Sequence, residues 1–360
     1  MPATRRAPGK TMQKGVATVA QLSEFDEIID ARTPAEFAAD HLPGAVNLPV
    51  LDNEQRVVVG TIYKQQSAFE ARRIGGALVA ANIAHHLQTC LKDKPKNWRP
   101  LVYCWRGGQR SGSFTTWLRM VGWDACQLEG GYKAFRHLVI DETKRIAPQL
   151  QLRIVCGPTG SAKTRVLDAL AALGAQTLDL EDLAAHKGSV LGALPDRPQP
   201  SQKHFETQLF TRLQAIDPAR PVYVEAESRK IGLLFVPEAL ILAMRRAPCV
   251  MIDASRDARL DFLVRDYAYL GEDIATLKHN LLRLRELQSR ETLARWHAMA
   301  DAGALPELFG ELIDLHYDPL YRRSQHGNYL GYGDAPRIAT TDLGPEGIRA
   351  LAQRILEQTG

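Results

Sequence analysis

One cysteine stands where a protein chain can stabilise a thiolate. Cys104 follows an apolar run at 100–103 and opens a loop with two glycines that leads into a helical pattern. A helix starting there would point its N–H groups and its dipole at the sulfur, which favours the thiolate. Arg106 and Arg110 add fixed positive charge, and Ser111 follows them. The loop predicts thiolate chemistry on an anionic substrate, provided that solvent reaches the thiol; the alternative is a structural cysteine beside two solvated arginines.

A second segment has the pattern of a phosphate-binding loop. The apolar run at 152–156 leads directly into residues 157–164, Gly-Pro-Thr-Gly-Ser-Ala-Lys-Thr, and spaced leucines and valines then indicate a helix. In such a unit the loop N–H groups wrap a phosphate, the lysine neutralises it, and the threonine can hold Mg²⁺. The expected phosphate-binding residues are Gly157, Gly160, Ser161, Lys163 and Thr164. A chance glycine-rich turn is the alternative.

Ala162 departs from this pattern, because GxxxxGK[ST] has a second glycine at that position. If the backbone there needs a positive φ, the methyl group costs about 1 kcal/mol. This departure weakens the case for nucleotide hydrolysis without removing anion binding.

Two carboxylates end another apolar run, at 221–225. Next to a phosphate-binding loop, Glu225 and Glu227 are candidates for ordering Mg²⁺ or for acid/base work, although no metal site is certain. Each could instead pair with Arg229 or Lys230. A third run, at 249–253, is expected in the same sheet.

Length and composition favour a soluble two-domain protein. A chain of 360 residues exceeds the roughly 250–300 residues at which single cores stop growing. No run approaches about 18 apolar residues and no signal peptide is evident, which predicts a cytoplasmic protein without a membrane partner. Five scattered cysteines argue against a disulfide framework and a zinc site. With a net charge of only +4, the basic clusters at 5–6, 283–295 and 322–323 permit, but do not require, a nucleic-acid partner.

The alternation of short apolar runs with helical patterns predicts an α/β fold with two mostly parallel sheets. Residues 1–140 are expected to form one domain, and residues 141–360 a second, with a helical part from about Arg256 onward. Within the first domain, Thr33 and Pro34 have the pattern of a helix start.

The first domain resembles a rhodanese domain. The resemblance rests on residues 30–37, 41–47 and 129–132 and on the Cys104 loop. It implies that Cys104 carries sulfur or selenium. Rhodanese sulfurtransferases place four residues between the cysteine and the loop arginine, whereas five separate Cys104 from Arg110 here. This spacing resembles rhodanese-like phosphatases and implies room for selenophosphate, phosphate or arsenate.

The second domain resembles the P-loop NTPase-like part of tRNA 2-selenouridine synthases. Residues 186–189, 199–206, 225–232 and 317–321 carry this resemblance, and residues 59–67 resemble an insertion of that family. It implies a transferase that geranylates the wobble 2-thiouridine of tRNA with geranyl diphosphate and then replaces the S-geranyl group with selenium from selenophosphate. It also implies possible Mg²⁺ and a possible selenophosphate-supplying enzyme as a further partner.

Residues 157–164 also resemble the loop of tRNA dimethylallyltransferases, which favours geranyl diphosphate over a nucleotide. The wobble base would have to flip out of the tRNA and stack on an aromatic side chain to react. Trp105, Tyr132 and Trp123 are candidate stacking surfaces, although a core role is the better interpretation for Trp123. Two other functions stay open: a rhodanese-like phosphatase or arsenate reductase, and a P-loop ATPase with a regulatory rhodanese module.

Overall fold

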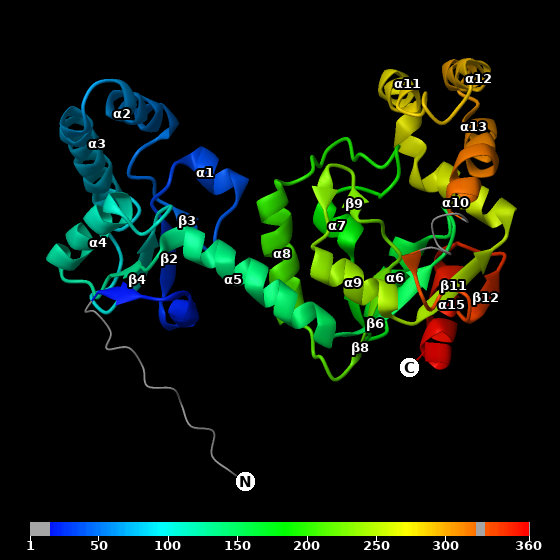
Figure 1. Ribbon diagram of the computed structural model, residues 1–360, viewed down its shortest axis with the longest axis horizontal. Helices are drawn as coiled ribbons and strands as arrows, with labels where there is room; N and C mark the ends of the chain where they lie inside the picture. The colour runs from blue at the N-terminus through cyan, green and yellow to red at the C-terminus, as the bar shows by residue number, and fades with distance from the viewer. Residues whose placement is uncertain (1–14, 322–327, 360) are drawn as a thin grey trace, which may run out of the picture. The chain divides into compact units, whose positions relative to one another are not determined.

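The computed structural model describes residues 15–321 and 328–359. The chain divides after Asp141 into two compact units, and each unit contains a five-stranded sheet in which all neighbouring strands are parallel (Figure 1). The predicted α/β class with two parallel sheets and a helical C-terminal part is therefore confirmed. The basic clusters at 5–6 and 322–323 lie outside the described residues.

The sheet of the first unit has the order β1-β5-β4-β2-β3. Its strands are β1 (Val16–Ala17), β2 (Glu27–Asp30), β3 (Val46–Asn47), β4 (Pro100–Tyr103) and β5 (Cys126–Leu128). Every residue of the central strand β4 is buried, as its apolar sequence requires. Cys104 directly follows β4 and therefore emerges at the carboxyl edge of the sheet, where open α/β sheets bind ligands.

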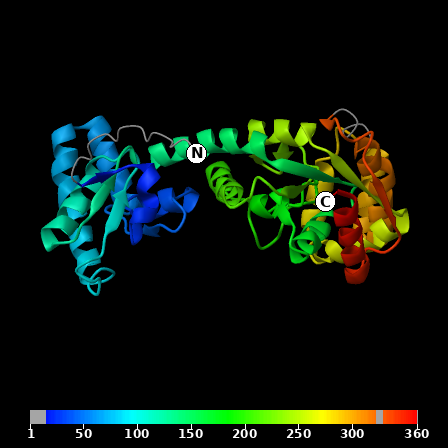
Figure 2. The same cartoon turned by 90° about the horizontal axis from the view of Figure 1, so that it is seen from below.

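Helices cover this sheet. They are η1 (Val19–Glu24), α1 (Pro34–Ala39), α2 (Asn53–Gln65), α3 (Ala68–Gln88), α4 (Gln109–Val121) and α5 (Gly131–Ile146). α2 and α3 pack side by side (Figure 2). α1 starts as predicted, because Thr33 caps its N-terminus and Pro34 opens its first turn. The core beneath α3 and α4 includes Ile29, Val102 and Phe114.

The sheet of the second unit has the order β12-β11-β6-β8-β7. Its strands are β6 (Gln151–Cys156), β7 (Gln176–Leu178), β8 (Pro221–Glu225), β11 (Cys249–Ala254) and β12 (Arg337–Thr340), and β9 (Lys230–Ile231) pairs with β10 (Leu234–Phe235) in a separate hairpin. The strands predicted at 152–156, 221–225 and 249–253 are confirmed as β6, β8 and β11. β12 was not predicted, because four residues after a long helical region carry too little periodicity to identify a strand.

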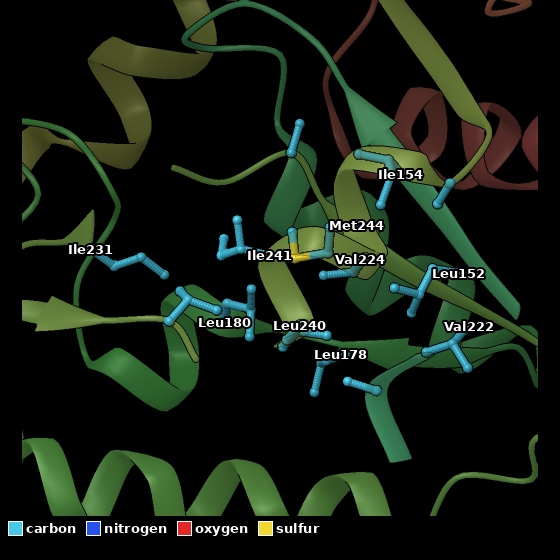
Figure 3. Packing of buried hydrophobic residues seen from close by; sticks show 14 of the residues in the cluster. Leu152, Ile154, Leu178, Leu180, Val222, Val224, Ile231, Leu240, Ile241 and Met244 are labelled. Carbon is cyan, nitrogen blue, oxygen red and sulfur yellow. The ribbon is translucent and has the colours of Figure 1, made fainter. Parts of the chain in front are cut away.

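Alternate residues of the strands point to opposite faces of this sheet. On one face, Leu152, Ile154, Val222 and Val224 pack with residues of α9 (Glu238–Arg246), including Met244 (Figure 3). The other face packs against α6 (Lys163–Ala172) and α15 (Pro345–Thr359). The remaining helices are η2 (Ala147–Gln149), α7 (Leu180–Ala184), α8 (Gln202–Gln214), α10 (Arg256–Asp266), η3 (Ala268–Gly271), α11 (Ile274–Leu282), α12 (Arg290–Asp301), α13 (Leu305–Leu312) and η4 (Ile313–Tyr317).

Across residues 15–321 and 328–359, no helix has both the length and the apolar composition needed to span a bilayer.

Candidate active sites

The sulfur of Cys104 lies at the N-terminus of α4, as the sequence predicts. The backbone N–H of Gly108, the N-cap residue of α4, donates to Sγ of Cys104 at 3.3 Å, and Oγ of Ser111 donates to the same sulfur at 3.1 Å. Ser111 is fully buried. The loop therefore supplies Sγ with two hydrogen-bond donors and the positive end of a helix dipole, which is an environment that stabilises a thiolate.

The Cys104 thiol is not open to solvent. The residue is 3% exposed, so the expectation of a solvent-accessible thiol is wrong for this conformation. The start of α5 closes the loop, because Tyr132 N–H donates to Cys104 O at 2.8 Å and Lys133 N–H donates to Trp105 O at 3.0 Å. Gly131 makes this approach possible: it has φ 56°, and a Cβ there would collide with the Cys104 carbonyl oxygen. A donor therefore reaches the sulfur only if the loop moves.

The two loop arginines are placed differently from each other. Arg106 is exposed, whereas Arg110 forms a bidentate ion pair with Glu36 of α1, at 2.6 and 3.2 Å. Burial raises the pKa of Glu36, but the hydrogen bonds from Arg110 outweigh this effect and leave the pKa below its usual value. The charge of Arg110 is thus partly neutralised. Sequence reasoning missed Glu36, although Glu three residues after Thr33 is the signal of a capping box.

A buried network of polar side chains supports the Cys104 loop. Arg32 donates to the Asp30 carboxylate at 2.6 Å, and its guanidinium lies 4.0 Å from the ring centroid of Tyr132. The Tyr132 hydroxyl donates to Asp40 at 2.7 Å, and burial raises the pKa of this tyrosine. Tyr132 is therefore a core residue. Among the three predicted stacking surfaces, Trp105 is the most exposed at 36%, and its ring contacts that of Tyr132.

Trp123 is a packing residue, in agreement with the core role predicted from the sequence. Its ring meets that of Trp98 edge-on at 5.2 Å, and its Nε1–H donates to Pro95 O at 3.0 Å. It is thus held within the wall of the first unit.

In the second unit, residues 159–164 line a cavity of about 780 Å³. Nζ of Lys163 lies in this loop and donates to Gly157 O at 3.1 Å, while Gly157 N–H donates to the Tyr321 hydroxyl at 2.7 Å. Gly160 has φ 86° and packs against Leu263 of α10. The structure thus brings Gly160, Ser161, Lys163 and Thr164 to one cavity, whereas Gly157 does not line it.

Ala162 occupies the left-handed region, with φ 57° and ψ 31°. Ala162 therefore has the positive φ on which the expected cost of its methyl group depends. The residue is 5% exposed and packs in the core beside α6, so its methyl group gains burial while its backbone is strained.

Three carboxylates gather beside the loop. Thr164 Oγ1 lies 3.0 Å from Glu181 Oε2 and 3.2 Å from Glu225 Oε2, and oxygen atoms of Glu181, Glu225 and Glu227 lie within 4.8 Å of one another. Glu225 is fully buried and its Oε1 has no hydrogen-bond partner. The structure brings Glu225 and Glu227 together and adds Glu181, which sequence reasoning missed. The available signal was an acidic residue three positions after the short strand β7, whose last residue is the buried Leu178.

Burial and mutual repulsion disfavour negative charge in this cluster. Burial, followed by the charge of Glu227, raises the pKa of Glu181 to about 8, and burial raises the pKa of Glu225 well above its usual value. A divalent cation would relieve both effects. Carboxylate and hydroxyl oxygens, one of them without a partner, are ligands that suit Mg²⁺, so the residues fit this ion.

The chain matches two family models. Residues 16–138 match the rhodanese-like domain, and residues 150–283 match the tRNA 2-selenouridine synthase AAA domain. Several relatives bear the name tRNA 2-selenouridine synthase, and three of them show the extent of the match. The one from Nitrosomonas europaea is 38% identical, and the match covers 67% of this chain and 63% of the relative. The one from Alcanivorax borkumensis is 33% identical, covering 82% and 88%, and the one from Cupriavidus necator is 34% identical, covering 88% and 93%.

Proposed function

This chain belongs to the tRNA 2-selenouridine synthase family, and from that premise we propose that it is a tRNA-modifying transferase that makes 2-selenouridine in two steps. In the first step, the sulfur of wobble 2-thiouridine attacks C1 of geranyl diphosphate, the C1–O bond breaks, diphosphate leaves, and the base loses its N3 proton. In the second, the selenium of selenophosphate attacks C2 of the base, geranylthiolate leaves and takes up a proton, and water then cleaves the P–Se bond, which releases phosphate and restores the N3 proton.

We assign the geranyl step to the second unit. The N–H groups within residues 159–164 and the ammonium group of Lys163 would hold the diphosphate, and Gly160 and Ser161 shape the loop. Gly157, whose N–H donates to the Tyr321 hydroxyl, would support the loop. Thr164, Glu225 and Glu227, joined by Glu181, would hold Mg²⁺, which would stabilise charge on the departing diphosphate. The partnerless oxygen of buried Glu225 is the observation that carries this assignment.

We assign the selenium step to the first unit. Cys104 would orient the selenium of selenophosphate, and Ser111 and the Gly108 N–H would stabilise negative charge on the sulfur. Arg106 would contact selenophosphate, and Arg110 would do so after its ion pair with Glu36 opens. The closed loop supports a site that opens only for its donor, because water with free access to bound selenophosphate would cleave its P–Se bond. The reaction would take place in the cytoplasm, with tRNA as substrate and a selenophosphate-supplying enzyme as the source of donor.

Nucleoside mass spectrometry of tRNA incubated with geranyl diphosphate and selenophosphate tests this division. Cys104→Ala should abolish selenouridine and leave S-geranyl-2-thiouridine, whereas Lys163→Ala should abolish geranylation and leave selenation of previously geranylated tRNA. Loss of the same single step in both variants would contradict the assignment of one step to each unit.

A further inference from the structure

The cavity at the phosphate-binding loop borders a groove of about 510 Å³ between α6, α10 and the start of α15. The groove and the cavity share four lining residues: Arg165, Asp168, Phe262 and Asp266. A ligand with its phosphates on the loop would reach the groove by passing these shared residues, of which Arg165 and Asp266 form an ion pair at 3.3 Å.

Most of the groove wall is carbon. Its apolar lining residues are Ala169, Phe262, Leu343, Pro345 and Ile348. Leu343 is buried, and Phe262 and Ile348 are half-buried because one side of each packs against the core between α6 and α15. The apolar surface formed by Phe262 and Ile348 is thus held in place by the core, and its position does not depend on a bound ligand.

The charged groups around the groove already have partners. Arg165 pairs with Asp266 at 3.3 Å and with Asp168 at 3.6 Å. Arg265 donates to the Leu343 carbonyl at 3.2 Å. A nucleobase is recognised through hydrogen bonds to its edge, whereas a hydrocarbon requires no polar partner. The groove therefore suits an apolar group better than a base.

Two backbone N–H groups at the turn that leads into α15 also have hydrogen-bond partners within the protein. Gly344 N–H donates to Asp342 Oδ1 at 2.7 Å, and Ile348 N–H donates to Gly344 O at 2.9 Å. These two N–H groups are consequently occupied within the protein and are not available to a ligand in the groove.

We propose that the groove binds the hydrocarbon chain of a prenyl diphosphate, with Phe262 and Ile348 as the residues that select for chain length. This inference rests on the proposed geranyl transfer and adds to it the subsite for the chain. A five-carbon chain would end near the shared residues, whereas a ten-carbon chain would extend along Phe262 and Ile348 and bury more apolar surface.

Calorimetric titration of the full chain with three ligands tests the subsite: geranyl diphosphate, dimethylallyl diphosphate and inorganic pyrophosphate. Phe262→Ser and Ile348→Ser should each weaken geranyl diphosphate about tenfold or more, because part of a large apolar contact is lost. Pyrophosphate affinity should stay unchanged, which also shows that the variant is folded. Leu287→Ser, at an exposed leucine outside the groove, is the matched control and should bind all three ligands as the wild type does.

Three outcomes separate the hypotheses. Unchanged geranyl diphosphate affinity in both groove variants, with wild-type binding intact, would overturn the chain subsite and leave the loop assignment standing. In a parallel titration with ATP, weakened ATP binding in the groove variants beside unchanged geranyl diphosphate binding would assign the groove to a base and overturn the proposal. If the wild type bound none of the three ligands, that result would instead contradict the proposed function of the loop.

A separate observation concerns Gln127 of β5, and from it we infer that this residue directs the Ser111 hydroxyl toward the Cys104 sulfur. Nε2 of Gln127 donates to Ser111 Oγ at 2.8 Å and to Gly108 O at 3.0 Å. Gly108 O also accepts from Gly112 N–H at 2.9 Å. Both lone pairs of this carbonyl are then used, and Ser111 Oγ is farther from it, at 3.4 Å, than hydroxyl hydrogen bonds normally are. The remaining acceptor for the Ser111 hydrogen is Sγ of Cys104.

Gln127 is therefore a positioning residue, and its effect is measurable as Cys104 reactivity. Gln127→Met keeps the length of the side chain and removes both N–H donors. Alkylation by iodoacetamide across pH, read on the Cys104 peptide by mass spectrometry, should show a midpoint moved to higher pH and about a tenfold lower rate at pH 7. Gln109→Met, at an exposed glutamine that lines the same side of the loop, is the control and should match the wild type.

Ser111→Ala should reproduce the effect, and the double variant should add nothing further, because both changes remove one donor from the sulfur. An unchanged profile in Gln127→Met beside a shifted profile in Ser111→Ala would overturn the role of Gln127. Fully additive shifts would also overturn it, since they would show two independent effects.

Discussion

The two candidate sites differ in how their polar groups are satisfied. At Cys104, the Gly108 N–H and the Ser111 hydroxyl both donate to the sulfur, and the residue is 3% exposed. At the phosphate-binding loop, a cavity of about 780 Å³ contains a buried carboxylate oxygen with no partner. The first arrangement suits transfer of a single atom in a closed environment. The second suits a large charged ligand that completes the site when it binds.

The sharpest way to break this comparison is to remove a partner inside the closed network of the first unit. Arg32→Leu should destabilise the protein by about 3–5 kcal/mol, because it leaves the Asp30 carboxylate buried without its charge partner. Denaturant unfolding followed by circular dichroism measures this change. Arg73→Leu is the control, since its ion pair with Glu70 is largely exposed and its loss should have little effect. Equal effects of the two changes would contradict the closed network.

A second prediction concerns access to the sulfur. In the native protein, iodoacetamide should react with Cys104 at least about tenfold more slowly than with exposed Cys90, because the loop must open first. Peptide mass spectrometry resolves the two cysteines, and denatured protein gives the reference rates. If the donor opens the loop, added selenophosphate should bring the alkylation rate of Cys104 closer to that of Cys90. Equal native rates would show that the site is already open.

The carboxylate cluster gives a prediction about pH. The pKa of Glu181 is raised to about 8, so its contribution to stability is present below the unfolded value near 4.5 and is lost as pH rises toward 8. Without metal, the wild type should therefore lose stability between pH 5 and pH 8, and Glu225→Gln should lose less. Thermal melts with a chelator measure this. A variant that is less stable than the wild type at pH 8 would contradict the repulsion.

Mg²⁺ should reverse that trend in the wild type. Because the ion binds deprotonated carboxylates, it should raise the melting temperature more at pH 8 than at pH 6. Glu225→Gln should show a smaller increase at pH 8. An equal response of both proteins would indicate that the ion binds elsewhere.

The smallest expected effect concerns the strained backbone of the loop. Ala171→Gly, at an exposed position inside α6, should cost about 1 kcal/mol through helix propensity. Ala162→Gly should be nearly neutral, because relief of the left-handed strain offsets the lost methyl burial and the added chain entropy. Chemical denaturation of both variants gives the comparison, and an equal cost at the two positions would argue against strain at Ala162.

Local order in the chain was sufficient to predict the elements that position both sites. A strand, a glycine-containing loop and a helix were expected at Cys104 and again at residues 157–164, and both units are present as β4–α4 and β6–α6. Such units depend on neighbours within a few residues, through burial of the strand and satisfaction of the helix N-terminus. The spacing of side chains along the sequence therefore determines them.

The contacts between elements were decided only by tertiary structure. Glu36 reaches Arg110, Gln127 reaches Ser111, and Glu181 joins Glu225 because separate strands end at the same sheet edge. Burial of Cys104 likewise results from α5 closing on the loop. Hydrogen bonds and repulsion depend on distances of a few ångströms between residues far apart in the chain, and no local pattern fixes those distances. The sequence alone therefore determined which chemistry each loop can offer, and the packing of the sheet decided which partners each reactive group has.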